Sequence, residues 1–269
     1  MELLLSPLFS GSSGNAVYVG AGRTGILVDA GVSCARVVSE MKATGIDPAA
    51  LSAILITHEH SDHVAGAGIL SRKFDLPIYA TEGTWSAMAE KLGAVSAKNI
   101  RVIESGQDFY IGDLDISPFP LPHDAADPCG YAFTCGRLRA AIATDIGCLR
   151  EGWLKAVSGC ELVLLESNYD PDMLKAGPYP YDLKKRILSR RGHLSNDDAG
   201  ETAGELIRAG TRQIILGHLS KENNFPELAL QTAQCLLRAD GIDPEEDVDL
   251  RVARRDAITG LFAVGAAMD

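Results

Sequence analysis

Four residues that commonly bind metals lie within six consecutive positions of this sequence: His58, His60, Asp62 and His63. An apolar run (SAILIT) precedes them and a helical pattern follows. At the end of an extended strand, residues i and i+2 point the same way, so His58 and His60 can bind one metal ion. Asp62 and His63 lie where the helix begins, and their side chains point toward a second position that can bind another metal ion. The alternative, a solvated loop that is rich in histidine by chance, is disfavoured by the specificity of the motif.

Three further ligand-type residues each end an extended apolar segment. His123 ends SPFPLPH, Asp145 ends AAIATD and His218 ends QIILGH. A single histidine is more often structural, but three such segments ending this way are typical of a site at the rim of a sheet. They supply a third imidazole for each of two metals and a carboxylate to bridge them. Imidazole and carboxylate suit Zn²⁺, Mn²⁺ or Fe, whereas Ca²⁺ would require oxygen ligands alone.

Together these residues resemble the metallo-β-lactamase-fold hydrolase superfamily over nearly the whole chain. The segment 27–31, LVDAG, matches the superfamily's first motif, in which the aspartate supports the histidine loop. The resemblance implies an α/β (α+β) fold, an αββα sandwich of two mixed sheets packed face to face with helices outside. It also implies the ligand sets: His58, His60 and His123 for metal one; Asp62, His63 and His218 for metal two; and Asp145 as the bridge.

Further motifs resemble one group within this superfamily. The segments SGSSGN (10–15), ESNYD (166–170), GHLSN (192–196) and GHLS (217–220) are similar to the YycJ (WalJ) group. That group is bacterial and cytoplasmic and is associated with 5′-to-3′ exonuclease activity on DNA. The same region is similar to ribonuclease Z and to the phosphodiesterase PhnP. The resemblance therefore implies DNA, in preference to RNA, as the substrate.

The expected reaction is hydrolysis of a phosphodiester by a hydroxide that bridges two metal ions. The candidate catalytic residues are Asp62, Glu166 and His193. Glu166 ends the strand ELVLLE and His193 lies in a glycine-flanked loop, and a carboxylate paired with an imidazole makes a general acid for the departing oxygen. The alternative is that His193 only caps a helix and Glu166 only supports a metal ligand.

Substrate contacts are expected from two segments and one asparagine. Residues 184–191, KKRILSRR, place five cations just before His193, although such a run is often only a solvated helix face. The serine- and glycine-rich loop 10–15 can offer backbone N–H groups to a phosphate, although such loops are also ordinary turns. Tyrosines 169, 179 and 181 can stack on a base, although aromatic residues in loops more often pack on the core. The candidate contacts are Ser12, Ser13, Asn15, Lys184, Lys185, Arg186, Arg190, Arg191 and Asn196.

Composition limits the other possibilities. The net charge of −11 disfavours non-specific coating by nucleic acid but allows a local basic strip. No apolar run approaches the length of a membrane span, and the N-terminus has no basic region of a secretory signal. The six cysteines include no CxxC pair and indicate reduced thiols, mostly buried. We therefore expect a cytoplasmic enzyme, without a membrane partner, that is a monomer or a homodimer.

Two other functions compete with the exonuclease hypothesis. One is a hydrolase of a small phosphodiester, thioester or lactone on the same metal pair. A glyoxalase-type relative would be expected to add a helical domain, and a secreted β-lactamase would be expected to carry an export signal; the sequence indicates neither. The other is a non-catalytic, metal-dependent regulator that binds nucleic acid, which the complete set of ligand positions disfavours.

Short apolar runs alternate with helical patterns, which indicates an α/β organisation. Residues 109–124 carry three prolines and are expected to be extended near a sheet edge, and 131–145 to form a hairpin. Residues 168–182 are expected to form an irregular, functional loop. Residues 1–269 are predicted to form one domain. Strands are expected at 2–9, 16–20, 25–31, 52–58, 77–80, 161–168, 212–220, 249–255 and 258–264, and helices at 34–45, 64–74, 84–93, 196–210 and 226–241.

Overall fold

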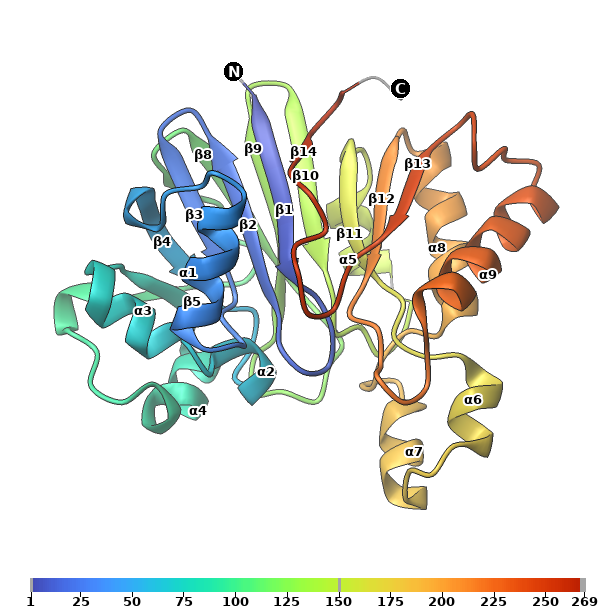
Figure 1. Cartoon of the computed structure of the whole chain (residues 1–269), viewed down its shortest axis with the longest axis horizontal. Helices are drawn as coiled ribbons and strands as arrows, with labels where there is room; N and C mark the ends of the chain where they lie inside the picture. The colour runs from blue at the N-terminus through green and yellow to red at the C-terminus, as the bar shows by residue number, and fades with distance from the viewer. Residues whose placement is uncertain (1, 150, 267–269) are drawn as a thin grey trace.

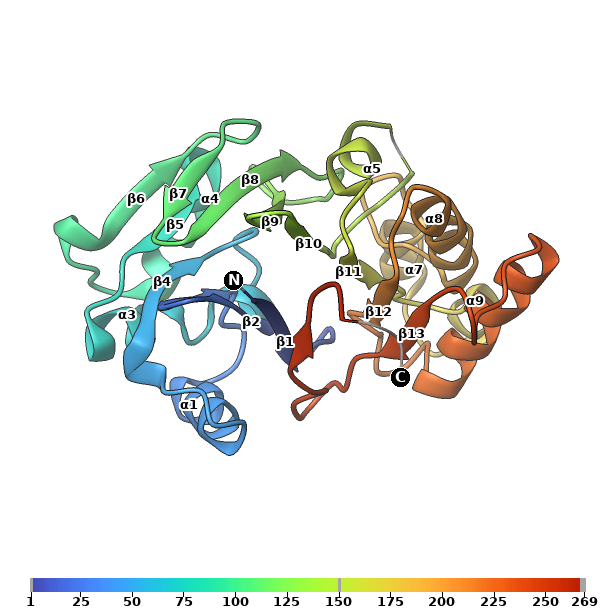
Figure 2. The ribbon, with the colours of Figure 1, turned by 90° about the horizontal axis from the view of Figure 1, so that it is seen from above.

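The computed structural model describes residues 2–149 and 151–266. Two seven-stranded sheets pack face to face, and helices cover both outer faces (Figure 1). Figure 2 shows the layers from above, with α1, α3 and α4 outside one sheet and α5, α8 and α9 outside the other. This arrangement confirms the αββα sandwich that the resemblance implied.

The first sheet has the order β14-β1-β2-β3-β4-β5-β6. Strands β3 to β6 run parallel, whereas the β14-β1-β2-β3 part is antiparallel. Pairing of β14 with β1 brings the two ends of the described chain into one sheet. The strand bounds are β1 Leu3–Phe9, β2 Ala16–Ala21, β3 Thr24–Val28, β4 Leu51–Leu55, β5 Ile78–Thr81, β6 Ile100–Ile103 and β14 Phe262–Ala263.

The second sheet has the order β13-β12-β11-β10-β9-β8-β7 and the same division into halves. Strands β10 to β13 run parallel and β7 to β10 antiparallel. The proline-rich β8 lies next to the edge strand β7, and β9 and β10 form a hairpin whose turn uses Gly136 at a φ of 63°, both as expected. The bounds are β7 Phe109–Ile111, β8 Leu114–Pro120, β9 Cys129–Cys135, β10 Leu138–Ala143, β11 Leu162–Glu166, β12 Gln213–Gly217 and β13 Asp249–Val252.

Three hydrophobic layers hold the sandwich together. The central layer joins the inner faces of the two sheets, for example through Leu5, Val28 and Tyr131. The two outer layers pack each sheet against its helices. Strands such as β11 are buried on both faces, which explains why the sequence LVLL is apolar without alternation.

The helices begin at recognisable signals. Ser33 caps α1 through its side chain, and Ser195 and Asp198 form a capping box at α8. No helix among the described residues is long and apolar enough to span a bilayer. The bounds are α1 Cys34–Ala43, α2 Ser61–Val64, α3 Ala67–Phe74, α4 Glu82–Leu92, α5 Glu151–Val157, α6 Pro171–Ala176, α7 Tyr181–Ile187, α8 Asn196–Arg208 and α9 Pro226–Ala239.

The structure differs from the sequence prediction in several places. Helix α5, for which the sequence analysis predicted no element, is one of them. The edge strand β6 was not predicted, because its side chains are mostly exposed and give no apolar pattern. The helix predicted at 64–74 begins at Ala67 as α3, and a separate helical turn, α2, precedes it; Gly66 between them packs closely on the backbone of Val32. The stretch 168–182 is not an irregular loop. It contains α6 and the start of α7, because Asp170 caps α6 and proline at the first helical position favours the helix.

Candidate metal centre

The carboxyl ends of parallel strands from both sheets meet at one rim. Asp29 follows β3, Asp145 comes two residues after β10, and His218 follows β12. All three have left-handed backbone conformations, with φ of 59°, 64° and 56°. Such conformations are costly for residues other than glycine and often occur at functional sites. Here they turn each side chain toward the centre of the rim.

Three imidazoles converge on one point. The distance from His58 Nε2 to His60 Nδ1 is 3.1 Å, and from His60 Nδ1 to His123 Nε2 it is 3.4 Å. Nitrogen ligands about 2.05 Å from a tetrahedral metal lie about 3.3 Å apart, so the spacing fits one ion. His123 Nδ1 faces the carbonyl of Gly192 at 3.0 Å, which fixes the ring and leaves Nε2 for the metal.

A second group lies beside the first. Asp62 Oδ2 is 3.6 Å from His63 Nε2 and 3.7 Å from His218 Nε2. Asp145 stands between the groups, with Oδ2 3.4 Å from His63 Nε2 and Oδ1 3.6 Å from His123 Nε2. Asp145 Oδ2 and His218 Nε2 are buried and have no hydrogen-bond partner. Buried polar atoms are rarely left unpaired, so these atoms fit a second cation.

The electrostatics of the two groups differ. Burial and the neighbouring His63 lower the pKa of His58 well below its usual value, so His58 is a neutral imidazole ready to bind a metal. Burial opposes a charge on His63, but Asp29, Asp145 and Asp62 together raise its pKa to about 9. In the second group a proton therefore occupies the position that a metal cation would take.

Asp29 supports the histidine loop as the resemblance implied. Its Oδ2 accepts hydrogen bonds from His63 Nδ1 at 2.8 Å and from Thr57 Oγ1 at 2.9 Å. Its Oδ1 accepts from the backbone N–H of Thr57 at 2.9 Å. These contacts orient His63 so that Nε2 faces the site.

Glu166 joins the metal centre to the candidate general acid. Its Oε1 lies 2.8 Å from both His193 Nδ1 and His218 Nδ1. Its Oε2 accepts backbone N–H bonds from Ile146 at 2.7 Å and Leu194 at 3.0 Å. Burial would raise the pKa of Glu166, but the two imidazoles lower it below its usual range. The carboxylate is fully buried and can reach the substrate only through His193.

A cavity of about 430 Å³ opens over the metal centre. Of the predicted substrate contacts, Ser12 and Arg186 line it. Arg186 also forms an ion pair with Asp124. The sequence analysis did not identify Lys91 or Ser220, which also line the cavity. Lys91 lies in α4 with no distinguishing motif, whereas Asp124 directly follows the ligand candidate His123 and could have been found from that pairing.

Seven predicted substrate contacts do not line this cavity. Asn15 and Asn196 are buried: Asn15 contacts His63 and Gly11, and Asn196 bonds to Ser167 and Asn224. The guanidinium of Arg191 donates to the carbonyls of His123 and Ala125. These three side chains hold the protein framework. Of the remaining four, Ser13 and Arg190 are exposed outside the lining, and Lys184 and Lys185 line a neighbouring cavity.

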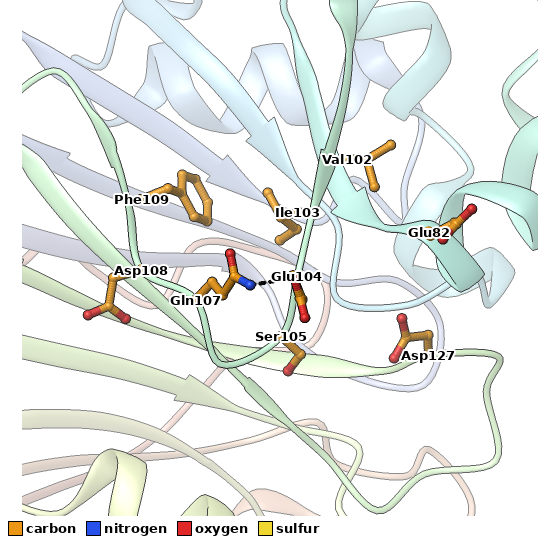
Figure 3. A pocket seen from close by; sticks show the side chains of 9 residues that line it. All are labelled: Glu82, Val102, Ile103, Glu104, Ser105, Gln107, Asp108, Phe109 and Asp127. Atoms are coloured by element: carbon orange, nitrogen blue, oxygen red, sulfur yellow. Dashed lines mark hydrogen bonds between the residues drawn. The ribbon is translucent and has the colours of Figure 1, made fainter.

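A larger cavity, of about 770 Å³, lies between β6, β7 and the start of α4 (Figure 3). Glu82, Glu104, Asp108 and Asp127 line it, and Gln107 donates to Glu104. It shares no lining residue with the metal centre and contains no imidazole. Its size alone does not make it the reactive site.

Comparisons with known proteins agree with this geometry. The family model described as "Beta-lactamase superfamily domain" matches residues 24–219. The chain is 38% identical over 250 residues to the exodeoxyribonuclease YycJ of Bacillus anthracis, covering 93% of this chain and 95% of the relative. It is 42% identical over 229 residues to the exodeoxyribonuclease WalJ of Streptococcus pneumoniae, covering 84% and 85%.

The fold also matches solved structures. The metallo-β-lactamase fold protein YhfI of Bacillus subtilis superposes with a TM-score of 0.71 at 16% identity, over 96% of this chain and 99% of YhfI. A likeness at this identity concerns the fold alone, whereas the family match and the two exodeoxyribonuclease relatives extend over most of the chain. The chain is a metal-dependent hydrolase that belongs to the metallo-β-lactamase superfamily, in the group of YycJ and WalJ.

Proposed function

We propose that this hydrolase is a two-metal phosphodiesterase that degrades DNA as an exonuclease, in the 5′-to-3′ direction. The observation that carries the proposal is the pair of ligand groups that share Asp145, with His193 beside them at the cavity. The identity to two exodeoxyribonucleases over most of the chain supports a DNA substrate. We also propose that residues 1–269 act as one domain, since β14 and β1 join both ends of the described chain in one sheet.

The metal ligands in this proposal are the seven residues at the rim. Two divalent ions, Zn²⁺ or Mn²⁺, would supply an activated water and neutralise charge on the phosphoryl oxygens. Asp145 contacts both ligand groups and therefore fixes their separation. The ligands are His58, His60 and His123 in the first group, Asp62, His63 and His218 in the second, and Asp145 between them.

His193 has the geometry of a general acid. Its Nδ1 is held by Glu166 at 2.8 Å, so Nε2 is the nitrogen available to a substrate in the cavity. The side chain is 16% exposed, enough to meet a ligand while its neighbours remain buried. We infer that Nε2–H protonates the departing oxygen of the phosphodiester. Glu166 keeps the ring in place during this transfer.

The cavity rim offers cations to a phosphate chain. Lys91 and Arg186 line it from opposite segments of the sequence, on α4 and α7. The Lys91 ammonium group donates to the carbonyl of Glu59 and is otherwise exposed. Asp124 partly neutralises Arg186. Lys91 is therefore the stronger candidate for contact with a phosphate beside the scissile one.

The decisive experiment compares the wild-type chain and His193→Ala on 5′-labelled DNA with Mn²⁺. We expect the variant to keep both metals and to lose turnover by about 10²–10⁴-fold, the usual contribution of a general acid. Metal analysis of both proteins separates loss of the acid from loss of the ions. Full kcat in His193→Ala would remove the acid role. If the metal-loaded wild type fails to cleave DNA with Mn²⁺ or Zn²⁺, the nuclease proposal is wrong.

A further inference from the structure

A further cavity lies along α7 and the end of α6, beside the metal centre. In Figure 1 these two helices lie below the ends of β11 and β12, apart from the main body of the sandwich. The cavity has a volume of about 630 Å³, which is in the range of ligand sites. Its lining combines aromatic and aliphatic surface with ammonium groups and includes no carboxylate. The lining residues are Lys175, Tyr179, Tyr181, Lys184, Lys185, Leu188 and Ser189.

The exposure of this lining is unusual for apolar side chains. Tyr181 is 77% exposed and Leu188 is 49% exposed. Below them, Leu174 and Ile187 pack with Tyr169 in a small separate core, against which Tyr179 and Leu183 lie. The framework of α6 and α7 is thus held by its own core, of which the exposed ring of Tyr181 is not a part.

The charge of this segment is opposite to that of the whole chain. Residues 171–191 contain six cations and two carboxylates, whereas the chain as a whole carries −11. Lys175 is paired with Asp172 at 3.3 Å, and Lys184 donates to the carbonyl of Lys175 at 2.7 Å. Lys185 is exposed on the same helix. A polyanion is therefore attracted to this surface and repelled by most of the rest.

The two cavities are adjacent. Tyr179 lines both the metal-site cavity and the α6–α7 cavity. Leu183, Arg186 and Ile187 of α7 line the metal-site cavity. Lys184 and Lys185 of the same helix, with Leu188 directly after it, line the other. A chain that leaves the metal centre past Tyr179 therefore meets this surface next.

We propose that the α6–α7 cavity binds the unpaired nucleotides next to the scissile phosphodiester, with a base stacked on Tyr181 and the backbone phosphates at Lys184 and Lys185. This inference rests on the proposed function and identifies its substrate as a single-stranded stretch of nucleic acid. Stacking on aromatic rings combined with a basic groove is the usual way to bind single strands without reading their sequence. Inside a duplex, neighbouring bases cover both faces of each base, so a base next to the scissile phosphodiester must leave the stack before it can lie on the Tyr181 ring.

The test compares two exposed tyrosines. Tyr181→Ala removes the ring from the cavity. Tyr110→Ala, in β7, removes a ring that is 73% exposed and outside this cavity, and serves as the matched control. Each metal-loaded protein is assayed on a single-stranded 20-mer and on bis(p-nitrophenyl) phosphate, which is too short to reach beyond Tyr179. We expect the ratio of kcat/KM on the 20-mer to that on the small ester to fall about tenfold in Tyr181→Ala, in the range of one lost base stack, and to stay constant in Tyr110→Ala.

A second measurement separates this inference from the proposed function. The affinity of each metal-loaded protein for a fluorescent 20-mer with non-cleavable phosphorothioate linkages is measured by anisotropy in 50 mM and 200 mM salt. We expect about tenfold weaker binding for Tyr181→Ala, and a shallower salt dependence for Lys184→Gln/Lys185→Gln. If the inference is wrong but the chain is a nuclease, Tyr181→Ala and Tyr110→Ala will show equal ratios of kcat/KM and equal affinities for the 20-mer. Failure of the nuclease proposal alone would appear as no cleavage by any protein, with the difference in affinity retained.

Discussion

The substitution Glu166→Gln tests how one buried carboxylate serves two histidines. In the wild type, Oε2 accepts from two backbone N–H groups and Oε1 faces the Nδ1 atoms of His193 and His218. A glutamine has one oxygen, which the two N–H groups of Ile146 and Leu194 require. Its NH₂ group then faces both imidazoles. Each Nδ1 must become an acceptor, which moves the ring proton to Nε2.

The expected effect is largest at the second metal. With a proton on Nε2, His218 no longer offers a lone pair to the cation, and loss of such a supporting partner typically lowers metal affinity 10–100-fold. The same change removes the carboxylate that orients His193, so turnover at saturating metal is expected to fall by about 10²-fold or more. The fold should survive, because the side chain keeps its volume and its two backbone hydrogen bonds.

The assay is a chelator competition that measures both metal affinities, combined with metal analysis and DNA cleavage at saturating Mn²⁺. We expect one tightly bound and one weakened metal, with the secondary structure of the metal-free protein retained. If Glu166→Gln binds two metals as tightly as the wild type and retains more than half of the turnover, the shared-carboxylate reasoning is refuted.

Two further predictions follow from the packing and charge of the rim. In Gly31→Ala, the new Cβ would lie 1.6 Å from the carbonyl oxygen of Asp62. We expect the variant to lose about 3 kcal/mol of folding stability, measured by denaturation, and to lose the second metal, measured by metal analysis. The control is Gly152→Ala, which has open space around its Cβ and lies in a helix, so it should not destabilise the protein. The pKa of His63 is raised to about 9 without metal, so a bound ion must displace its proton at any lower pH. Burial opposes a charge on His218, but Asp145, Asp62 and Glu166 raise its pKa as well, so its proton must also leave. Affinity for the second metal should therefore rise at least tenfold per pH unit below pH 9, with proton release seen by calorimetry in buffers of different ionisation enthalpy; a pH-independent affinity would contradict this assignment.

The types of the candidate ligands and their places in the fold could be predicted from the sequence. His58, Asp145 and His218 each come at or just after the end of an apolar strand, and the periodicity of buried strands is a local property. The carboxyl ends of parallel strands meet at one rim, so residues at these positions converge once the sheets form. The resemblance to a known superfamily supplied the pairing of the two sheets, which periodicity alone could not.

Several of the predicted substrate contacts lie away from the metal-site cavity. A polar residue in a loop looks the same in sequence whether it faces the substrate or the protein. Asn15 and Asn196 were expected at the substrate and instead satisfy buried neighbours. Arg191 appeared to belong to a cationic strip but is turned toward the carbonyl of His123. Which partner a polar side chain meets depends on chain segments far away in sequence.

The chemistry of the rim follows from local sequence, which places imidazoles and carboxylates in one motif and at strand ends. That one oxygen of Glu166 faces both His193 and His218, and that Tyr179 lies between two cavities, follows only from the three-dimensional fold. The two kinds of information differ in the sequence separation of the residues that interact. Helix and strand signals depend on residues a few positions apart, whereas these contacts join segments up to 52 positions apart whose approach depends on the packing of the whole sandwich.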